Sequence, residues 1–188
     1  MSKLYFKYGV MGSSKSAVAL MTKYNYEQKG FQILLLKPSI DTRDGDKVCS
    51  RIGISCDCFK FDKDFDLLEY FKLITKEQSF NGVIVDEVQF CTKQQIEQLR
   101  EISNFVPVIC FGLKTNFKSE LFEGSKRLIE IADNISEIKT VCKCGNKAII
   151  NAKVVDGKMV KDGNEIDIGG DEKYISICYN CWNKGKAD

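Results

Sequence analysis

The sequence contains no histidine in its 188 residues. This absence excludes Ser/His/Asp and Cys/His nucleophile arrangements, histidine general bases and histidine zinc ligands, so proton transfer must rely on carboxylates, lysine, tyrosine or cysteine. The chain also lacks an apolar run approaching the roughly 20 residues that cross a bilayer, and we expect no membrane partner. Its 28 basic and 26 acidic residues leave a net charge of +2. That balance does not mark a nucleic-acid-binding protein, and we expect no nucleic-acid partner.

The composition that remains is that of an ordinary globular protein. Apolar residues make up 44% and charged residues 29%, which argues against wholesale disorder. The start of the chain becomes rich in glycine and serine at 9–16, before the apolar stretch of a signal peptide could form. We therefore expect a cytoplasmic protein. Nine cysteines are many for that compartment, and their odd number and close pairs favour metal binding over a disulfide framework.

Hydrophobic patterning predicts alternating strands and helices over the first part of the chain. Strands are expected at 3–8, 31–36, 83–85 and 106–111, and helices at 15–28, 67–74, 92–102 and 125–133. In the first helix, Val18, Met21 and Tyr24 or Tyr26 are expected on or near one face. The alternation predicts an α/β fold in which crossover helices join parallel strands.

Two regions depart from this alternation. Residues 38–58 show no clear periodicity, and their polar segment at 41–46 predicts a mobile or ligand-ordered loop. After Thr140, two cysteine pairs flank a hairpin signal at Asp156-Gly157. We therefore expect a larger domain at 1–139 and a second at 140–188, which is below the size that a core alone usually stabilises.

A phosphate-binding motif lies between the first strand and the first helix. It consists of Gly9, Val10, Met11, Gly12, Ser13, Ser14, Lys15 and Ser16. In such a motif backbone N–H groups cradle the phosphates, the lysine reaches the β- and γ-phosphates, and the hydroxyl after it binds Mg²⁺. Ser14 stands where the pattern has its second glycine, and it either adopts the required backbone angles at some cost or weakens the cradle. The alternative is a flexible strand–helix connection in which Lys15-Ser16 occurs by chance.

A pair of acidic residues follows the buried strand at 83–85. Asp86 ends this strand and is placed to hold Mg²⁺, whereas the adjacent Glu87 points the other way and is available as a base. Acidic residues at strand ends are also often merely solvated. Together with the phosphate-binding motif, the pair favours an Mg·ATP site.

Four cysteines form two close pairs, Cys142 with Cys144 and Cys178 with Cys181. The pattern predicts a structural zinc site that supplies the folding energy a small domain lacks. The first pair is one residue tighter than the usual C-x-x-C, and the alternative is four reduced cysteines in a small β core. No function is assigned to Cys49, Cys56, Cys58, Cys91 and Cys110. The aromatic residues Phe90, Phe117 and Tyr174 either belong to the core or stack on a base.

Taken together, these segments resemble the type II (cellular, zinc-containing) thymidine kinase family. The resemblance is carried by YFKYGVMGSSKS at the start, DTR at 41–43, SRIG at 50–53, VDEVQF at 85–90, FGLKTNFKSELFEGS at 111–125, the two cysteine pairs and IDIGGDEKYISIC at 166–178. They span essentially the whole chain in the family's order. The resemblance implies a RecA-like P-loop kinase domain with a parallel sheet at 1–139, and a zinc-binding β domain with a lasso-like substrate loop at 140–188. It also implies a homotetramer, with a dimer as the alternative.

The reaction implied by the resemblance is transfer of the γ-phosphate of ATP to the 5′-hydroxyl of thymidine, with Glu87 as general base. The implied ligands of the triphosphate and Mg²⁺ are residues 9–16, Asp41, Thr42, Arg43, Asp86 and Gln89. The residues implied around thymidine are Met11, Phe90, Leu113, Phe117, Tyr174 and the lasso segment Glu165, Ile166, Asp167, Ile168 and Gly169. The four paired cysteines match the zinc ligands, and inhibition by the end product dTTP is expected.

The leading hypothesis is therefore an ATP-dependent thymidine kinase of nucleotide salvage that uses ATP, Mg²⁺ and structural Zn²⁺. One alternative is a sensor of thymidine nucleotides in which Ser14 has weakened catalysis. A second is a zinc-ribbon nucleic-acid binder with an ATPase domain, against which the near-neutral charge counts.

Overall fold

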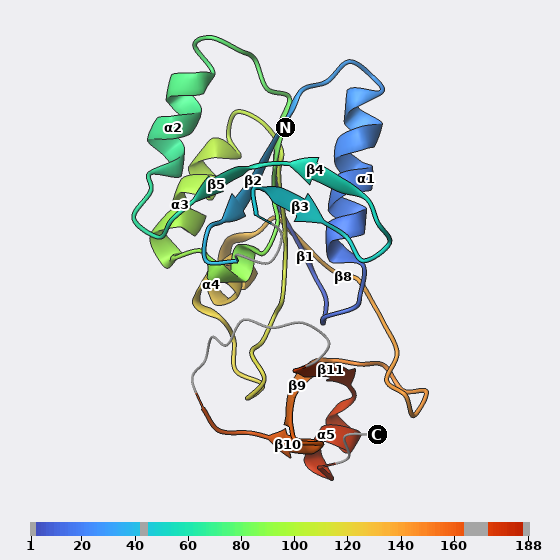
Figure 1. Cartoon of the computed structure of the whole chain (residues 1–188). Helices are drawn as coiled ribbons and strands as arrows, with labels where there is room; N and C mark the ends of the chain where they lie inside the picture. The colour runs from blue at the N-terminus through green and yellow to red at the C-terminus, as the bar shows by residue number, and fades with distance from the viewer. Residues whose placement is uncertain (1–2, 42–44, 164–172, 186–188) are drawn as a thin grey trace.

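The computed structural model describes residues 3–41, 45–163 and 173–185. Its centre is a six-stranded sheet with strand order β5-β2-β6-β7-β1-β8, in which every pairing is parallel (Figure 1). The strands are β1 (Leu4–Tyr8), β2 (Ile33–Pro38), β5 (Phe59–Phe61), β6 (Gly82–Val85), β7 (Val108–Gly112) and β8 (Asn134–Glu137). The predicted α/β fold with a parallel sheet is confirmed.

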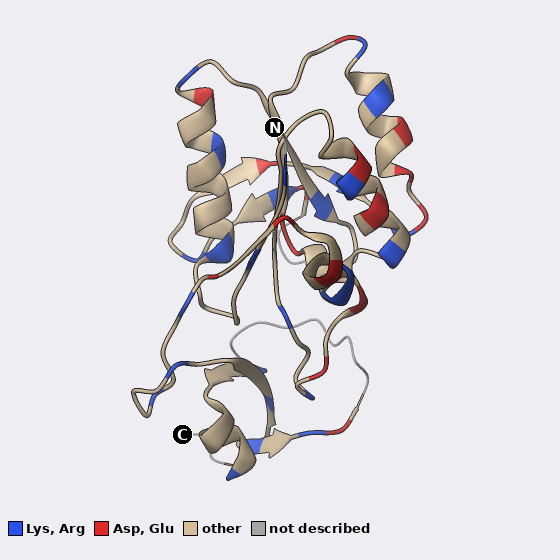
Figure 2. Cartoon of the chain, turned by 180° about the vertical axis from the view of Figure 1, so that it is seen from behind, with Lys and Arg blue, Asp and Glu red and all other residues tan. Residues whose placement is uncertain are grey.

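Helices cover both faces of this sheet, because its central strands are apolar on both sides. The helices are α1 (Lys15–Glu27), α2 (Leu67–Ile74), α3 (Lys93–Ile102) and α4 (Glu123–Ile131). Leu34 and Leu36 of β2 belong to the core under α2, α3 and α4, whereas Ile33 and Leu35 belong to the core under α1. This alternation follows from the two-residue repeat of a strand. Figure 2 shows basic and acidic residues interspersed over these helices.

Some observed elements differ in detail from the prediction or were not predicted. Met21 and Tyr24 of α1 are exposed, and the helix instead buries Ala17, Ala19 and Leu20. Val18 and Tyr26 of the predicted face do pack against the core with Ala19 and Leu20, so the prediction holds for these two and is wrong for Met21. The small alanines were overlooked because the pattern was taken from large residues. The second strand begins at Ile33, and β8 was not predicted because its polar sequence pairs with β1 only at the sheet edge.

Residues 38–58 contain more structure than their lack of periodicity predicted. Strands β3 (Lys47–Cys49) and β4 (Ser55–Asp57) form an antiparallel hairpin, and Val48 of β3 is buried beside α1. Three-residue strands are too short to produce a detectable period. Residues 42–44 of the predicted loop lie outside the described residues.

The C-terminal part forms a second, smaller sheet with strand order β10-β9-β11, followed by the short helix α5 (Tyr179–Asn183). Strands β9 (Ile150–Val155) and β10 (Lys158–Val160) are joined at Asp156 and Gly157, whose φ angles of 50° and 74° suit a tight hairpin turn. This turn confirms the predicted hairpin; β11 (Tyr174–Ile177) pairs with the other side of β9. Across the described residues, no helix is long and apolar enough to cross a membrane.

Candidate active site

The phosphate loop (residues 9–16) leaves the carboxyl end of β1 and turns into α1. Its main chain is sharply folded, since the Ser13 amide donates to the Val10 carbonyl at 3.2 Å. The Lys15 ammonium is buried and donates to the same carbonyl at 2.8 Å. Gly9 is required by close approach, because a Cβ there would lie 2.6 Å from the Ile138 carbonyl oxygen. The loop thus places a buried cation and a helix N-terminus together, as a phosphate site needs.

Ser14 keeps the backbone conformation of the glycine that it replaces. Its φ of 64° and ψ of 24° lie in the left-handed region. A residue with a Cβ is strained there by about 1–2 kcal/mol. Of the two outcomes expected for this serine, the structure has the first, in which the backbone angles are adopted at some cost.

Asp86 lies at the carboxyl end of β6, beside the phosphate loop. Its carboxylate is buried and accepts a hydrogen bond from the Ser16 hydroxyl. Burial, and then the charge of Glu87, raise the pKa of Asp86 to about 6, whereas the Ser16 hydrogen bond and the charge of Lys15 act to lower it. Among the described residues its Oδ1 atom has no hydrogen-bond partner. An orphaned buried carboxylate oxygen next to a hydroxyl suits a divalent cation with oxygen ligands.

Glu87 stands at the start of the short helix η1 (Val88–Phe90), with a left-handed φ of 54°. The Gln89 side-chain NH₂ group donates to the Glu87 carboxylate. The Gln89 side-chain oxygen accepts from the Leu113 main-chain N–H at 2.9 Å. Gln89 therefore connects the acidic turn to the chain after β7. Because Gln89 is buried and engaged at both ends, it fixes the orientation of the Glu87 carboxylate.

One pocket joins these groups to a set of apolar side chains. Of the predicted site residues, those that line it are Met11, Gly12, Ser14, Lys15, Ser16, Glu87, Gln89, Phe90, Leu113, Phe117 and Tyr174. Phe122 adds to the apolar end and meets the Phe90 ring edge-on, with 5.9 Å between ring centroids. The pocket therefore brings together phosphate-loop residues, a carboxylate and an aromatic part of the kind that accepts a planar base.

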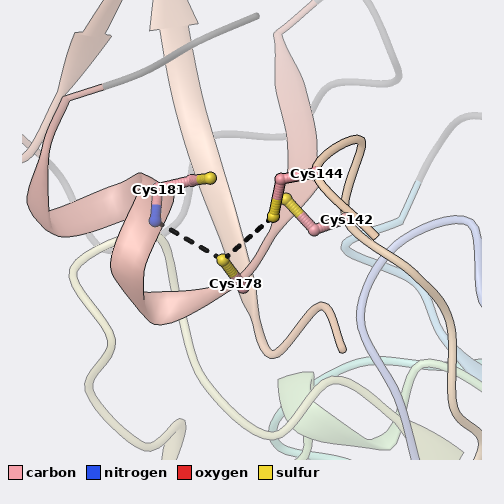
Figure 3. A group of neighbouring side chains, drawn as sticks. All are labelled: Cys142, Cys144, Cys178 and Cys181. Atoms are coloured by element: carbon pink, nitrogen blue, oxygen red, sulfur yellow. Dashed lines mark hydrogen bonds between the residues drawn. The ribbon is translucent and has the colours of Figure 1, made fainter. Parts of the chain in front are cut away.

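The four paired cysteines converge in the C-terminal part, as Figure 3 shows. All four Sγ atoms lie within 4.8 Å of one another, and those of Cys144 and Cys178 are 3.6 Å apart. Tetrahedral zinc with Zn–S bonds near 2.3 Å places sulfurs roughly 3.8 Å apart. The main-chain N–H of Cys181 points at the Cys178 sulfur, 3.4 Å away. The cluster therefore fits a four-cysteine zinc site.

Comparison with known proteins agrees with this arrangement. A family model described as thymidine kinase matches residues 2–182. The chain belongs to the thymidine kinase family. It is 45% identical to the thymidine kinase of Enterobacteria phage T4 over 98% of this chain and 97% of that protein. The thymidine kinases of Legionella pneumophila and Haemophilus influenzae are 42% and 43% identical, over 100% and 95% of this chain and 92% and 94% of theirs.

Some residues matched to the thymidine kinase motifs lie away from the pocket lining or outside the described residues. Asp41 is buried and pairs with the Lys37 ammonium at 3.0 Å, behind the carboxyl end of β2. Asp86 lies beside the phosphate loop rather than in the lining. Gly9, Val10 and Ser13 belong to the loop but do not line the pocket either. Predicted site residues outside the described part are Thr42, Arg43, Glu165, Ile166, Asp167, Ile168 and Gly169.

Three polar residues near the thymidine kinase site had no role assigned from sequence. Arg51, in the turn of the β3–β4 hairpin, lines the pocket, and one guanidinium nitrogen lies 3.3 Å from where a Cβ on Gly12 would stand. Asn151 of β9 and Ser176 of β11 hydrogen-bond to the main chain of Met11. The available signal for Asn151 was its polar side chain within an apolar run, Ile149 to Ala152.

Proposed function

We propose that the chain is an ATP-dependent kinase that transfers the γ-phosphate of ATP to the 5′-hydroxyl of thymidine. The observation that carries this proposal is that the phosphate loop, the Glu87 carboxylate and a set of aromatic side chains line one pocket. Phosphoryl transfer requires positioning and charge stabilisation more than covalent chemistry. A pocket with these three parts meets those requirements for a nucleoside acceptor.

The phosphate end would bind the triphosphate through main-chain N–H groups of residues 9–16 and through Lys15. The Lys15 ammonium now donates to the Val10 carbonyl, and the β- and γ-phosphates would replace this neutral acceptor with a charged one. Arg51, whose guanidinium approaches Gly12, would add a second cation there. Positive groups at this end stabilise the negative charge on the transferring oxygens.

Mg²⁺ would be held by Asp86 and Ser16, whose side chains meet beneath the phosphate loop. The ion supplies charge neutralisation of the phosphates. The unpartnered Oδ1 of Asp86 among the described residues supports this assignment. Zn²⁺ would be held by Cys142, Cys144, Cys178 and Cys181 and would stabilise the C-terminal part.

Glu87 would accept the proton of the thymidine 5′-hydroxyl. A sugar hydroxyl is a poor nucleophile at neutral pH, and a positioned carboxylate assists its deprotonation as the phosphate is transferred. The Gln89 amide holds this carboxylate in one orientation. Phe90, Phe117 and Tyr174 would enclose the thymine, together with Leu113 and Met11. The matched lasso segment at 165–169 would complete the contacts to the base.

The test is transfer of labelled phosphate from ATP and Mg²⁺ to a panel of acceptors. We expect label on thymidine, with much less on deoxycytidine or uridine and none on water in the no-acceptor control. If thymidine raises the melting temperature but receives no label, the chain is a sensor and not a kinase. Equal labelling of all nucleosides would contradict the proposal that the aromatic end selects thymine.

Further properties of the proposed enzyme follow from its family. We expect a cytoplasmic homotetramer. We also expect dTTP to inhibit it, because dTTP carries both a base for the aromatic end and phosphates for the loop. Inhibition should weaken as thymidine is raised at fixed ATP in a steady-state assay. Full activity at millimolar dTTP would overturn this expectation.

A further inference from the structure

Two side chains of the second sheet hydrogen-bond to the main chain of one phosphate-loop residue, Met11. The Met11 main-chain N–H donates to the Asn151 side-chain oxygen at 2.6 Å, and the Ser176 hydroxyl donates to the Met11 carbonyl. Asn151 and Ser176 are directly opposite each other in the β9–β11 pairing. Because paired residues project on the same face of a sheet, the two side chains bind the donor and the acceptor of one residue from a common platform.

The neighbouring residue of the loop is part of the apolar core of this sheet. Val10 is buried in a cluster with Cys142, Cys178 and apolar residues of β9 and β11. The Val10 side chain therefore packs in one cluster with two of the paired cysteines. The main chain of the next residue, Met11, is bound by Asn151 and Ser176. Asn151 itself is only 3% exposed, so removing its hydrogen bond leaves a buried polar group without compensation from water.

The hydrogen bonds of the loop itself converge on the Val10 carbonyl, whereas the N–H and the carbonyl of Met11 are bound by Asn151 and Ser176. Gly12 and Ser14 both have positive φ angles. This conformation is strained for a serine, and a glycine adopts many other conformations as easily. Phosphate binding requires the N–H groups of the loop to point to one place before the ligand arrives, since a small misplacement costs rate.

We propose that Asn151 and Ser176 are positioning residues that hold the phosphate loop in its phosphate-binding shape. The zinc-ligating part of the chain thereby acts on the donor end of the site as well as on the base. This proposal rests on the proposed function for the identity of the ligand, Mg·ATP. It adds that affinity for the phosphate donor depends on two side chains that need not touch the phosphates.

The test compares Asn151→Ala, Ser176→Ala and the double variant with wild type. We expect each single change to raise the Kd of Mg·ATP in calorimetry by about threefold to tenfold and to lower kcat, with a smaller rise in the Kd of thymidine because Met11 also lines the base end. The two effects should be less than additive on the free-energy scale, because both side chains act on one peptide segment. Ser176→Thr keeps the hydroxyl and should restore affinity for Mg·ATP.

Hydrogen exchange provides a readout that does not depend on turnover. The amide of Met11 should exchange at least tenfold faster in Asn151→Ala, whereas Asn134→Ala, which removes an exposed asparagine from β8, should change neither exchange nor Mg·ATP affinity. An unchanged Mg·ATP Kd in folded Asn151→Ala and Ser176→Ala, or a loss confined to thymidine, would overturn the positioning role. Wild type that binds Mg·ATP but phosphorylates no nucleoside would instead refute the proposed function and leave this comparison intact.

Discussion

At the scale of single residues, two non-glycine residues with positive φ line the pocket. Ser14, the N-cap residue of α1, has a φ of 64°, and Glu87, the N-cap residue of η1, has a φ of 54°. Each such conformation costs of order 1–3 kcal/mol. Both persist because neighbouring bonds determine them: α1 begins at Ser14 with the Val18 amide on its carbonyl, and Gln89 binds the Glu87 carboxylate.

Replacing Ser14 by glycine tests how well the phosphate loop tolerates this serine. The substitution relieves the left-handed strain but increases the freedom of the unfolded chain by a comparable amount. We expect the free energy of unfolding to change by no more than about 1 kcal/mol, and kcat for thymidine to stay within threefold. An inactive wild type together with an active Ser14→Gly would show that serine had silenced the loop. Urea unfolding and steady-state kinetics on the same preparations measure both quantities.

The sequence identified residues that belong to contiguous motifs better than residues that meet through the fold. Lys15, Ser16, Asp86 and Glu87 could be selected because each follows a strand and has the side chain its chemistry needs. Asn151 and Ser176 could not, because their relation to Met11 depends on how the second sheet packs against the phosphate loop. The hydrogen bond by which Gln89 orients the Glu87 carboxylate could not be predicted either, because it depends on a short turn that has no hydrophobic period.

At the scale of elements, α4 supports the acidic turn by close backbone contact. A Cβ on Gly124, in the first turn of α4, would lie 2.6 Å from the Val88 carbonyl oxygen and 2.8 Å from that of Cys91. These are main-chain atoms of the first residue of η1 and of the residue that follows it, and η1 carries Gln89 and Phe90. Only glycine permits the helix to approach this turn so closely.

Gly124→Ala should therefore destabilise the protein although alanine favours helices. Overpacking costs about 1–3 kcal/mol, which exceeds the gain in helix propensity of about 1 kcal/mol. We also expect a higher KM for thymidine as Phe90 shifts. The matched control is Lys126→Ala, at an exposed site of the same helix, which should change stability by less than about 0.5 kcal/mol. Equal stability of Gly124→Ala and wild type in urea would contradict this account.

Elements with strong local signals were predicted and those without were not. The capping box of Thr92 and Gln95 is present at the start of α3, and the central strands carry apolar residues on both faces. The β3–β4 hairpin and β8 are short or polar, and they exist because α1 and β1 offer them a surface and hydrogen bonds. Tertiary contacts of this kind override local preference.

At the scale of the whole molecule, the four-cysteine cluster lies where the second sheet packs against the phosphate loop. Cys142 and Cys178 share an apolar cluster with Val10 of the phosphate loop. A structural zinc ion in a site of this kind contributes roughly 10 kcal/mol or more to folding of the surrounding segment. Loss of a zinc ion held there should therefore affect the adjoining phosphate loop as well as the C-terminal sheet.

Cys178→Ser should abolish binding of one zinc ion per chain, measured by elemental analysis. We expect it to speed hydrogen exchange in β9 and β11 and to weaken Mg·ATP binding. Cys56→Ser, at a half-buried thiol of β4 outside the cluster, should retain zinc and serves as the control. Full zinc content in Cys178→Ser, or slow exchange in β9 after zinc removal, would show that the cluster does not stabilise this sheet through a metal.

The central claim is that one pocket brings the γ-phosphate of ATP to a thymidine hydroxyl beside the Glu87 carboxylate. The measurement that tests it most directly is the single-turnover rate of phosphate transfer to thymidine by wild type and by Glu87→Gln. The exposed Glu120→Gln provides the matched control. The account predicts a rate about 10²- to 10⁴-fold lower in Glu87→Gln, with the Kd of thymidine and of Mg·ATP within about threefold of wild type. A Glu87→Gln variant that transfers phosphate at the wild-type rate would contradict it.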